Sequence, residues 1–238
     1  MKPVHSFPRL VLMLACLVPL ALAQSPGDSL LNPALERVLG QMDSAAAKFH
    51  TTEASVVWDQ YQKVVDEHET QKGKVYFRRS GSEVQMAADI TEPDRKYVLF
   101  RDSKVQVYQP KIEQVTAYNT GKNREEIESF LVLGFGGRGH DMLKSFDVKY
   151  LGKEDVEEME TAKLDLVPKE MSVRNNIDHI VLWIDSARGV SVQQQFFFGN
   201  SGDYRLAKYS DIKVNEKIPD AAFKLKTTAK TKFISTRD

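Results

Sequence analysis

Short segments of alternating apolar and polar residues, separated by tight turns, fill most of this chain and restrict what it can fold into. The segments are rich in β-branched and aromatic residues, and turn sequences such as Ser80-Gly81-Ser82 and Glu92-Pro93-Asp94 divide them. Connections this short join antiparallel strands, because a parallel crossover needs about a dozen residues or more. The pattern predicts about eleven strands, at 54–65, 73–79, 84–90, 96–100, 104–109, 114–119, 147–153, 161–167, 178–185, 190–198 and 205–214.

Helices are predicted where the apolar period changes from two to between three and four. Asn32 and Pro33 are typical of a helix start, and helix 33–49 carries one apolar stripe. Two more helices, 124–133 and 139–146, flank the glycine-rich run between them. We interpret that run as a flexible joint, since it lacks the Lys-Ser/Thr of a phosphate-binding loop.

Some strands are apolar on both faces of the predicted sheet. In strand 178–185, for example, Ile180 and Leu182 alternate with Val181 and Trp183. A sheet with one solvated face would alternate more cleanly between apolar and polar residues. The second face therefore needs a cover, and the three helices are available. A strongly curved sheet with helices over its concavity follows, and this shape can enclose an apolar cavity.

The N-terminal segment has the composition of an export signal. Lys2 and Arg9 precede an apolar run over 10–22, and Ala21-Leu22-Ala23 supplies small residues for cleavage. The run is shorter than the roughly 20 apolar residues of a membrane span. We expect a cleaved signal peptide at 1–23, a flexible leader at 24–32 and one domain at 33–238. The mature protein would then be exported and soluble.

Cys16 offers an alternative interpretation of the same segment. Met13-Leu14-Ala15-Cys16 resembles a bacterial lipobox, in which the cysteine is acylated and retained. A lipobox normally has Leu at the position of Met13, and the apolar run continues past Cys16. Simple secretion is therefore favoured. Because Cys16 is the only cysteine, no intramolecular disulfide can form, and cleavage would leave no thiol nucleophile.

Charge and motif content argue against several functional classes. The 33 basic and 33 acidic residues balance, and the lysines and arginines are scattered, so a nucleic-acid surface is not expected. There is no Gly-x-Ser-x-Gly elbow. No metal site is expected, because none of the later histidines has metal-ligand spacing, and we place His68 in a solvated hairpin turn. We therefore predict no enzyme activity and no cofactor. The histidines after the signal segment are His50, His68, His140 and His179.

Arg79 is the most informative polar residue. It shares one strand face with Val75 and Phe77, because strand side chains alternate. At the end of an apolar face an arginine can extend to solvent. Alternatively, it points into the concavity and donates hydrogen bonds to carbonyls of the covering helices, which would hold them closed. The pattern alone favours the solvent-directed arrangement.

Several motifs, in order, resemble those of the LolA family of periplasmic lipoprotein carriers. The strongest is Tyr108-Gln109-Pro110-Lys111-Ile112-Glu113-Gln114-Val115-Thr116, which is similar to the family's Tyr-x-Pro-x-x-Glu-Gln-x-Thr segment. The resemblance also covers Phe49-His50, 73–79, Thr91-Glu92-Pro93-Asp94, the lid-helix segment 130–133, and Asn215, Ile218, Phe223 and Leu225 at the spacing of a closing strand. Two departures are Ser80-Gly81, where the family has proline after the arginine, and Glu83, where an apolar residue is usual.

The resemblance implies a mainly β (α+β) fold, an incomplete antiparallel β-barrel of about eleven strands with a three-helix lid over its concave face. It implies a periplasmic chaperone, expected to be monomeric, that receives acylated lipoprotein cargo from an inner-membrane ABC lipoprotein-releasing complex. An outer-membrane acceptor then takes the cargo, and the carrier hydrolyses nothing. Arg79 matches the family arginine that clasps the lid through helix carbonyls.

Candidate cavity residues follow from the strand pattern and the lid segments. The opposite strand face remains an alternative, because a one-residue slip would exchange every strand assignment. A module that binds another amphiphile, such as a glycolipid, is the second hypothesis. A lipid hydrolase is the third, and it would need a buried Ser or Asp beside a His. The candidates are Trp58, Val75, Phe77, Met86, Leu99, Val105 and Val107 from the strands, and Leu131, Leu133, Met142 and Leu143 from the lid.

Overall fold

The computed structural model divides the chain into two units, Met1–Leu30 and Leu31–Asp238, and every residue described below belongs to the second. The signal peptide predicted at 1–23, nearly all of the leader at 24–32, most of the helix predicted at 124–133, and Leu131 lie outside the described residues. In the part of the chain that is described, no helix is long and apolar enough to cross a membrane. The described residues are 32–81, 83–102, 104–119, 130, 132–199 and 201–236.

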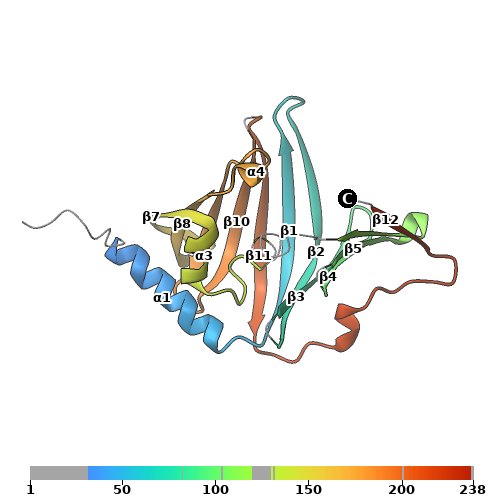
Figure 1. Cartoon of the computed structure of the whole chain (residues 1–238), viewed down its shortest axis with the longest axis horizontal. Coiled ribbons are helices and arrows are strands. Elements are labelled where there is room, and N and C mark those ends of the chain that lie inside the picture. Colours follow the sequence, from blue (N-terminus) through green and yellow to red (C-terminus); the bar gives the residue numbers. More distant parts are fainter. Residues whose placement is uncertain are drawn as a thin grey trace, which may run out of the picture. The chain divides into compact units, whose positions relative to one another are not determined.

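Twelve strands form one strongly curved sheet in the order β12-β6-β5-β4-β3-β2-β1-β11-β10-β9-β8-β7 (Figure 1). The sheet does not close, which confirms the predicted incomplete antiparallel barrel. The sequence did not predict β12, which pairs parallel to β6. The strands are β1 (Thr51–Gln62), β2 (Glu67–Ser80), β3 (Glu83–Glu92), β4 (Lys96–Arg101), β5 (Lys104–Gln109), β6 (Gln114–Asn119), β7 (Phe146–Val156), β8 (Met159–Pro168), β9 (His179–Asp185), β10 (Val190–Phe198), β11 (Asp203–Val214) and β12 (Lys232–Thr236).

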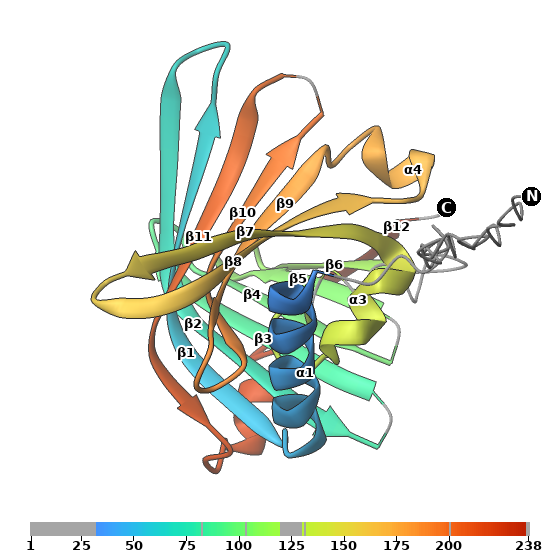
Figure 2. The same cartoon turned by 90° about the vertical axis from the view of Figure 1, so that its left-hand side faces the viewer.

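Helices α1 (Pro33–Ala47) and α3 (Gly139–Ser145) pack together on one face of the sheet, which we call the inner face (Figure 2). The side chain of Asn32 caps α1 by accepting a hydrogen bond from the N–H of Ala34 at 2.9 Å. The other described helical segments are short. They are α4 (Met171–Arg174) and the 3₁₀ turns Pro110–Ile112 and Asp220–Phe223.

The apolar stripe of α1 belongs to a large cluster of buried side chains. Leu35, Leu39 and Met42 pack with strand residues such as Leu164 and Leu182, and all five side chains are buried. Burial of side chains of this size stabilises the fold by roughly 1.5–3 kcal/mol each. The stripe therefore fixes α1 over the part of the sheet formed by β8 and β9.

A C-terminal segment, which the sequence did not predict as a cover, packs on part of the outer face of the sheet. Helices α1 and α3 lie over the concave, inner face, as predicted. Ile218 and Phe223 pack on Ala87 and Leu99. The guanidinium of Arg78 lies 4.1 Å from the centre of the Phe223 ring. Asn215, Ile218, Phe223 and Leu225 lie in a loop and a 3₁₀ turn rather than in the closing strand that the resemblance implied.

The glycine-rich run, which was predicted to be a joint between helices, is closely packed against its neighbours. Gly134 and Gly136 have φ angles of +76° and +79°, which side-chain-bearing residues rarely adopt. A Cβ at Gly136 would lie 2.4 Å from the Phe49 ring, and one at Gly139 would lie 2.5 Å from the carbonyl oxygen of Leu39. The glycines therefore permit close approach to α1 and to the residues that follow it.

His140 joins α3 to α1 through two carboxylates. Its Nδ1 lies 2.7 Å from Oδ2 of Asp43, and its Nε2 lies 3.0 Å from Oε1 of Glu36. The hydrogen bond to Asp43, followed by that to Glu36, raises the pKa of His140 above its usual value. Both ring nitrogens can donate at the same time only when the imidazole is protonated.

Matched glycine substitutions test the close packing of α3 on α1. Gly139→Ala should lower the free energy of unfolding by about 1–3 kcal/mol, because its methyl group would meet the backbone of Leu39. Gly40→Ala, inside α1 with open space around it, should raise that free energy by about 0.5–1 kcal/mol. Urea unfolding measures both, and equal effects of the two substitutions would contradict the packing described.

The His140 contacts should make stability depend on pH. Because the folded-state pKa is raised, the stabilisation is complete below the unfolded-state pKa of about 6.5 and is lost as pH rises through the folded-state pKa. The difference in unfolding free energy between the unsubstituted protein and His140→Gln should therefore shrink between about pH 6 and about pH 8.5. Urea unfolding at both pH values tests this, and a constant difference would refute it.

Candidate functional site

A cavity of about 470 Å³ lies on the inner face of the sheet, beside the buried cluster under α1. Its volume is within the range of roughly 300–1,000 Å³ typical of small-molecule sites. Most of the lining is apolar or aromatic, and it comes from strands on both sides of β1. The apolar lining residues are Trp58, Val75, Phe77, Met86, Val98, Val107, Phe130, Ile177, Phe196, Phe198, Ala207 and Tyr209.

The structure brings five of the predicted strand residues to this cavity. Trp58, Val75, Phe77, Met86 and Val107 all contribute to its lining. Their shared location follows from strand alternation, because β1, β2, β3 and β5 direct alternate side chains to the inner face. Val105 lies outside the lining but packs against the same cluster of buried side chains.

Leu99 was assigned to the wrong face. It packs on the outer face with Ala87 and Phe223, whereas its neighbour Val98 lines the cavity. Both residues are apolar, so the pattern along β4 does not distinguish the faces. The strand register distinguishes them. Val98 pairs with Val107, which lines the cavity, whereas Leu99 pairs with Gln106 on the opposite face.

The predicted lid residues lie in the neighbouring core rather than in the cavity wall. Leu133 and Met142 are buried in the cluster formed by α1, α3 and the β8–β9 part of the sheet, and Leu143 packs against it. Phe130, which the sequence analysis had not selected, packs against that cluster and also lines the cavity. Of the described lid residues, only Phe130 therefore lines the cavity, and the others pack in the adjacent buried cluster.

Phe135, at the centre of the glycine-rich run, packs against the cavity lining. Its ring stacks on Phe77, with centroids 4.4 Å apart and an interplanar angle of 8°. It also meets Tyr209 edge-on, at 4.9 Å and 79°. Only 1% of its surface is exposed. The glycines around Phe135 allow the chain to turn tightly enough to insert this ring.

Arg79 connects this turn to the end of α1. Its Nη2 donates to the carbonyl oxygens of Gly136 at 2.8 Å and Ala46 at 3.3 Å, and its Nε donates to that of Phe49 at 3.3 Å. The guanidinium carbon also lies 5.7 Å from the centre of the Phe49 ring. A guanidinium keeps its charge and presents several fixed donors, so it suits a position where three carbonyl groups converge.

A second set of hydrogen bonds holds the same turn and was missed by the sequence analysis. Nε2 of Gln194 donates to the carbonyl oxygen of Leu133 at 2.5 Å, and the hydroxyl of Tyr209 donates to Oε1 of Gln194 at 3.1 Å. Burial raises the pKa of Tyr209, which keeps this hydroxyl protonated and able to donate. Gln194 is 5% exposed. The only available signal in the sequence was the run Gln193-Gln194-Gln195 between the apolar ends of β10.

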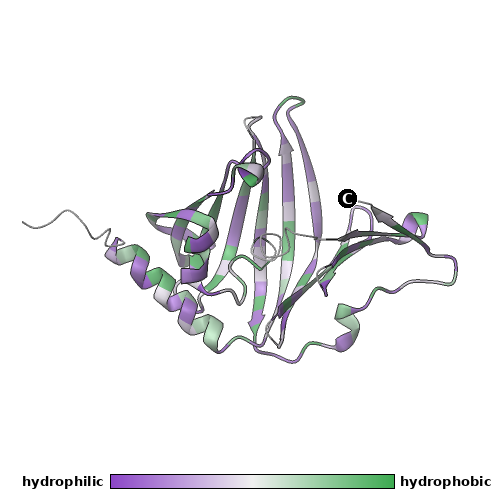
Figure 3. Cartoon of the chain, in the orientation of Figure 1, coloured by the Kyte–Doolittle hydropathy of each residue, from purple (hydrophilic) through white to green (hydrophobic). Residues whose placement is uncertain are grey.

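The other end of the cavity is polar. Gln60, Glu69, Gln71, Lys96 and Arg205 line it. Burial, together with the positive charge of Arg205, lowers the pKa of Lys96. In Figure 3 the parts of β1 and β2 nearest their connecting hairpin are coloured mostly hydrophilic, in agreement with this change along the strands.

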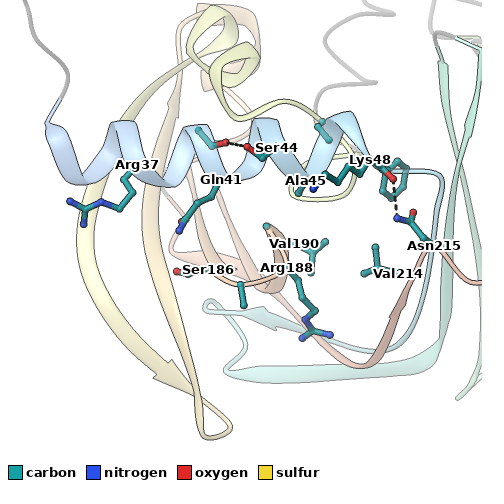
Figure 4. Close-up of a pocket in the computed structure, with 17 residues that line it drawn as sticks. Arg37, Gln41, Ser44, Ala45, Lys48, Ser186, Arg188, Val190, Val214 and Asn215 are labelled. Atoms are coloured by element: carbon teal, nitrogen blue, oxygen red, sulfur yellow. Dashed lines mark hydrogen bonds between the residues drawn. The ribbon is translucent and has the colours of Figure 1, made fainter.

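A larger hollow of about 620 Å³ lies between α1 and the β9–β10 turn, away from the aromatic lining (Figure 4). Much of its wall consists of glycines and polar side chains. The polar side chains from α1 are Arg37, Gln41 and Ser44. Arg188 is already engaged with Asp185 and the carbonyl oxygen of Ile212. Nδ2 of Asn215 donates to the carbonyl oxygen of Lys48 at 2.9 Å, which ties β11 to the end of α1. These features favour a structural role.

Metal-binding and catalytic sites both need several polar or ionisable side chains close together. Among the described residues no cluster of three or more His, Cys, Asp or Glu could hold a metal ion. His68 lies in β2 beside Asp59 rather than in the hairpin turn, which corrects the sequence analysis. The described cavity lining contains no serine, aspartate or histidine of the kind that a hydrolase would need.

An incomplete antiparallel barrel with helices on its inner face and an apolar cavity defines a class of ligand-binding carriers. Residues 50–226 match the family described as outer membrane lipoprotein carrier protein LolA, and the chain belongs to this family. No curated protein sequence matches the chain.

Solved structures share the fold at low sequence identity. An uncharacterised conserved protein from Thermus thermophilus aligns with a TM-score of 0.54 and 11% identity, covering 85% of this chain and 99% of that one. MucB aligns with a TM-score of 0.52 and 11% identity over 82% of this chain, which spans 63% of MucB. Lipoprotein LppX of Mycobacterium tuberculosis aligns with a TM-score of 0.47 and 15% identity, covering 79% of this chain and 99% of that one.

Two adjacent arginines of β2 provide a test of the contacts at the turn. Arg79→Met removes the donors to three carbonyl groups, so unfolding free energy should fall by about 1–3 kcal/mol. Amide hydrogen exchange over 132–139 should accelerate by about tenfold or more. In Arg78→Met, which changes the outer face, faster exchange should appear over 215–225 instead. The same exchange pattern in both variants would contradict the assignment.

Proposed function

We propose that this protein is a periplasmic chaperone that shields the acyl chains of a lipoprotein and carries it from the inner to the outer membrane. The observation that supports this best is the inner-face cavity, whose wall is mainly apolar and aromatic and against which Phe135 packs. The carrier domain would comprise residues 33–238. Membership of the LolA family, whose description names an outer membrane lipoprotein carrier protein, supports the same proposal.

The physical need for such a carrier comes from the aversion of acyl chains to water. Each buried methylene contributes roughly 0.8 kcal/mol, so one long chain represents on the order of 10 kcal/mol. A carrier must offset that cost and still release its cargo. A loose apolar cavity does both better than a tightly complementary one, because it shields the chains without adding strong specific contacts.

In this proposal Arg79 is a clasp that stabilises the closed form. Its donors engage carbonyl groups at the end of α1 and in the glycine-rich turn, so the contacts are complete only when these segments are together. Movement of the turn away from Phe77 would enlarge the cavity and break these hydrogen bonds. Bound cargo then has to offset their loss, and their re-formation favours release.

Partners and location belong to the same proposal. An inner-membrane ABC lipoprotein-releasing complex would supply the acylated cargo, an outer-membrane acceptor would receive it, and the carrier would act as a monomer. The expected signal peptide at 1–23 supports export to the periplasm. MucB of Pseudomonas aeruginosa, which has a related fold, has been solved in complex with MucA.

A binding module for another amphiphile, such as a glycolipid, is the second candidate. The observation in its favour is the polar end of the cavity, where Lys96 and Arg205 would face a headgroup. Mass spectrometry of cargo retained after native purification separates the two candidates. Triacylated lipoprotein supports the first, and a different lipid supports the second.

Two substitutions on neighbouring positions of β5 test the cavity itself. Val107→Glu places a carboxylate in the lining and should reduce co-purified acylated cargo by at least about tenfold, because burying a charge among apolar groups is costly. Gln106→Glu, on the opposite face of the same strand, is the control and should retain its cargo. Cargo is quantified by mass spectrometry, and unchanged loading of Val107→Glu would refute acyl binding in this cavity.

A further inference from the structure

Inner-face side chains change from apolar to polar along three neighbouring strands, all in the same direction. On β1 the series runs from Val56 through Trp58 to Gln60. On β2 it runs from Phe77 and Val75 to Gln71 and Glu69, and on β11 it runs from Tyr209 and Ala207 to Arg205. The cavity is thus amphipathic along its length.

The strand register brings the polar ends together. Arg205 pairs with Gln60, and Gln60 pairs with Glu69 on its other side. Phe196 of β10 pairs with Arg205 and also lines the cavity. These four side chains therefore form one row across β10, β11, β1 and β2, with an aromatic ring at one end and charged groups beside it.

Two cations and one carboxylate line this end. Nη2 of Arg205 donates to Oε1 of Gln60 at 3.2 Å, and its guanidinium carbon lies 5.8 Å from the centre of the Phe198 ring. Lys96 approaches from β4. Oε1 of Glu69 accepts a hydrogen bond from Gln71. Within the described part of the chain, neither cation has a carboxylate at ion-pair distance, so positive charge predominates next to the apolar wall.

Such an arrangement favours an anion. Burial and the neighbouring guanidinium disfavour the charged form of Lys96, and an anion between the two cations would reverse both effects. Hydrogen bonds from ammonium and guanidinium groups to a carboxylate or phosphate are about twice as strong as those between neutral groups. The planar donor fork of Arg205 also matches the geometry of these anions.

We infer that Lys96 and Arg205 bind the anionic headgroup, a carboxylate or a phosphate, of an amphiphile whose acyl chain occupies the apolar part of the cavity. This inference rests on acyl binding in the cavity, which both proposed functions share. It favours the second of them, a module for another amphiphile, because the groups next to the acyl chains of a triacylated lipoprotein are uncharged. Trp58 and Phe196 lie where the cavity lining changes from polar to apolar, so they would contact the part of the acyl chain nearest the headgroup.

Calorimetric titration of the delipidated protein tests the inference with ligands that share one chain and differ in headgroup. The probes are laurate, dodecyl phosphate, uncharged dodecanol and inorganic phosphate alone. We expect laurate and dodecyl phosphate to bind at least about tenfold more tightly than dodecanol, the factor that corresponds to one charge-assisted hydrogen bond. Inorganic phosphate alone should bind far more weakly than dodecyl phosphate, since it lacks the chain.

Three variants assign the effect to the two cations. Lys96→Met and Arg205→Met should each weaken laurate binding about tenfold while leaving dodecanol binding unchanged, which also shows that the cavity is intact. Lys208→Met is the matched control, since Lys208 lies on β11 but borders a hollow on the outer face. Its laurate affinity should equal that of the unsubstituted protein.

The possible results separate this inference from the proposed function. Equal affinities for laurate and dodecanol, or unchanged laurate binding in both cation variants, would overturn the headgroup site while leaving acyl binding in place. Failure of all three chain-bearing probes to bind would overturn the proposed function and the inference together. Binding of inorganic phosphate as tight as that of dodecyl phosphate would identify a site for a free anion and overturn the inference.

Discussion

An open sheet that is apolar on both faces has to be covered twice, and the rest of this structure depends on how the two covers differ. On the outer face, the segment around Ile218 and Phe223 packs directly onto β3 and β4. On the inner face, α1 fills the part over β8 and β9 but leaves a cavity over β1 and its neighbours. The cavity is therefore apolar surface that none of the described residues fills.

The inner cover is held at its edge by polar contacts as well as by packing. Arg79 and Gln194 attach the glycine-rich turn through backbone carbonyl groups, and Phe135 fills the space beneath it. Hydrogen bonds of this kind contribute only about 0.5–1.5 kcal/mol each, and more when a charge takes part. In the proposed function, the burial of an acyl chain offsets the loss of these hydrogen bonds, which is the property that a carrier with reversible binding needs.

Alternation along the strands and the stripe on α1 made most of the fold predictable, because each is a local pattern. The pattern fails at Leu99, where Val98 and Leu99 are both apolar and only the pairing with β5 shows which one faces inward. It also fails at β12, whose partner β6 is more than a hundred residues away in the sequence. The polar end of the cavity was missed because Lys96 and Arg205 come from strands that three others separate, and both line one cavity only because the folded sheet is curved.

Covalent mapping of a bound acyl chain tests the central claim, that the inner-face cavity holds the chain. A laurate analogue with a photoreactive group at the end of its chain can be irradiated on the purified protein and located by peptide mass spectrometry. We expect labelling at inner-face positions such as Phe77, Met86 and Val107. Labelling concentrated on the outer face, at Leu99, Ile218 or Phe223, would contradict the claim.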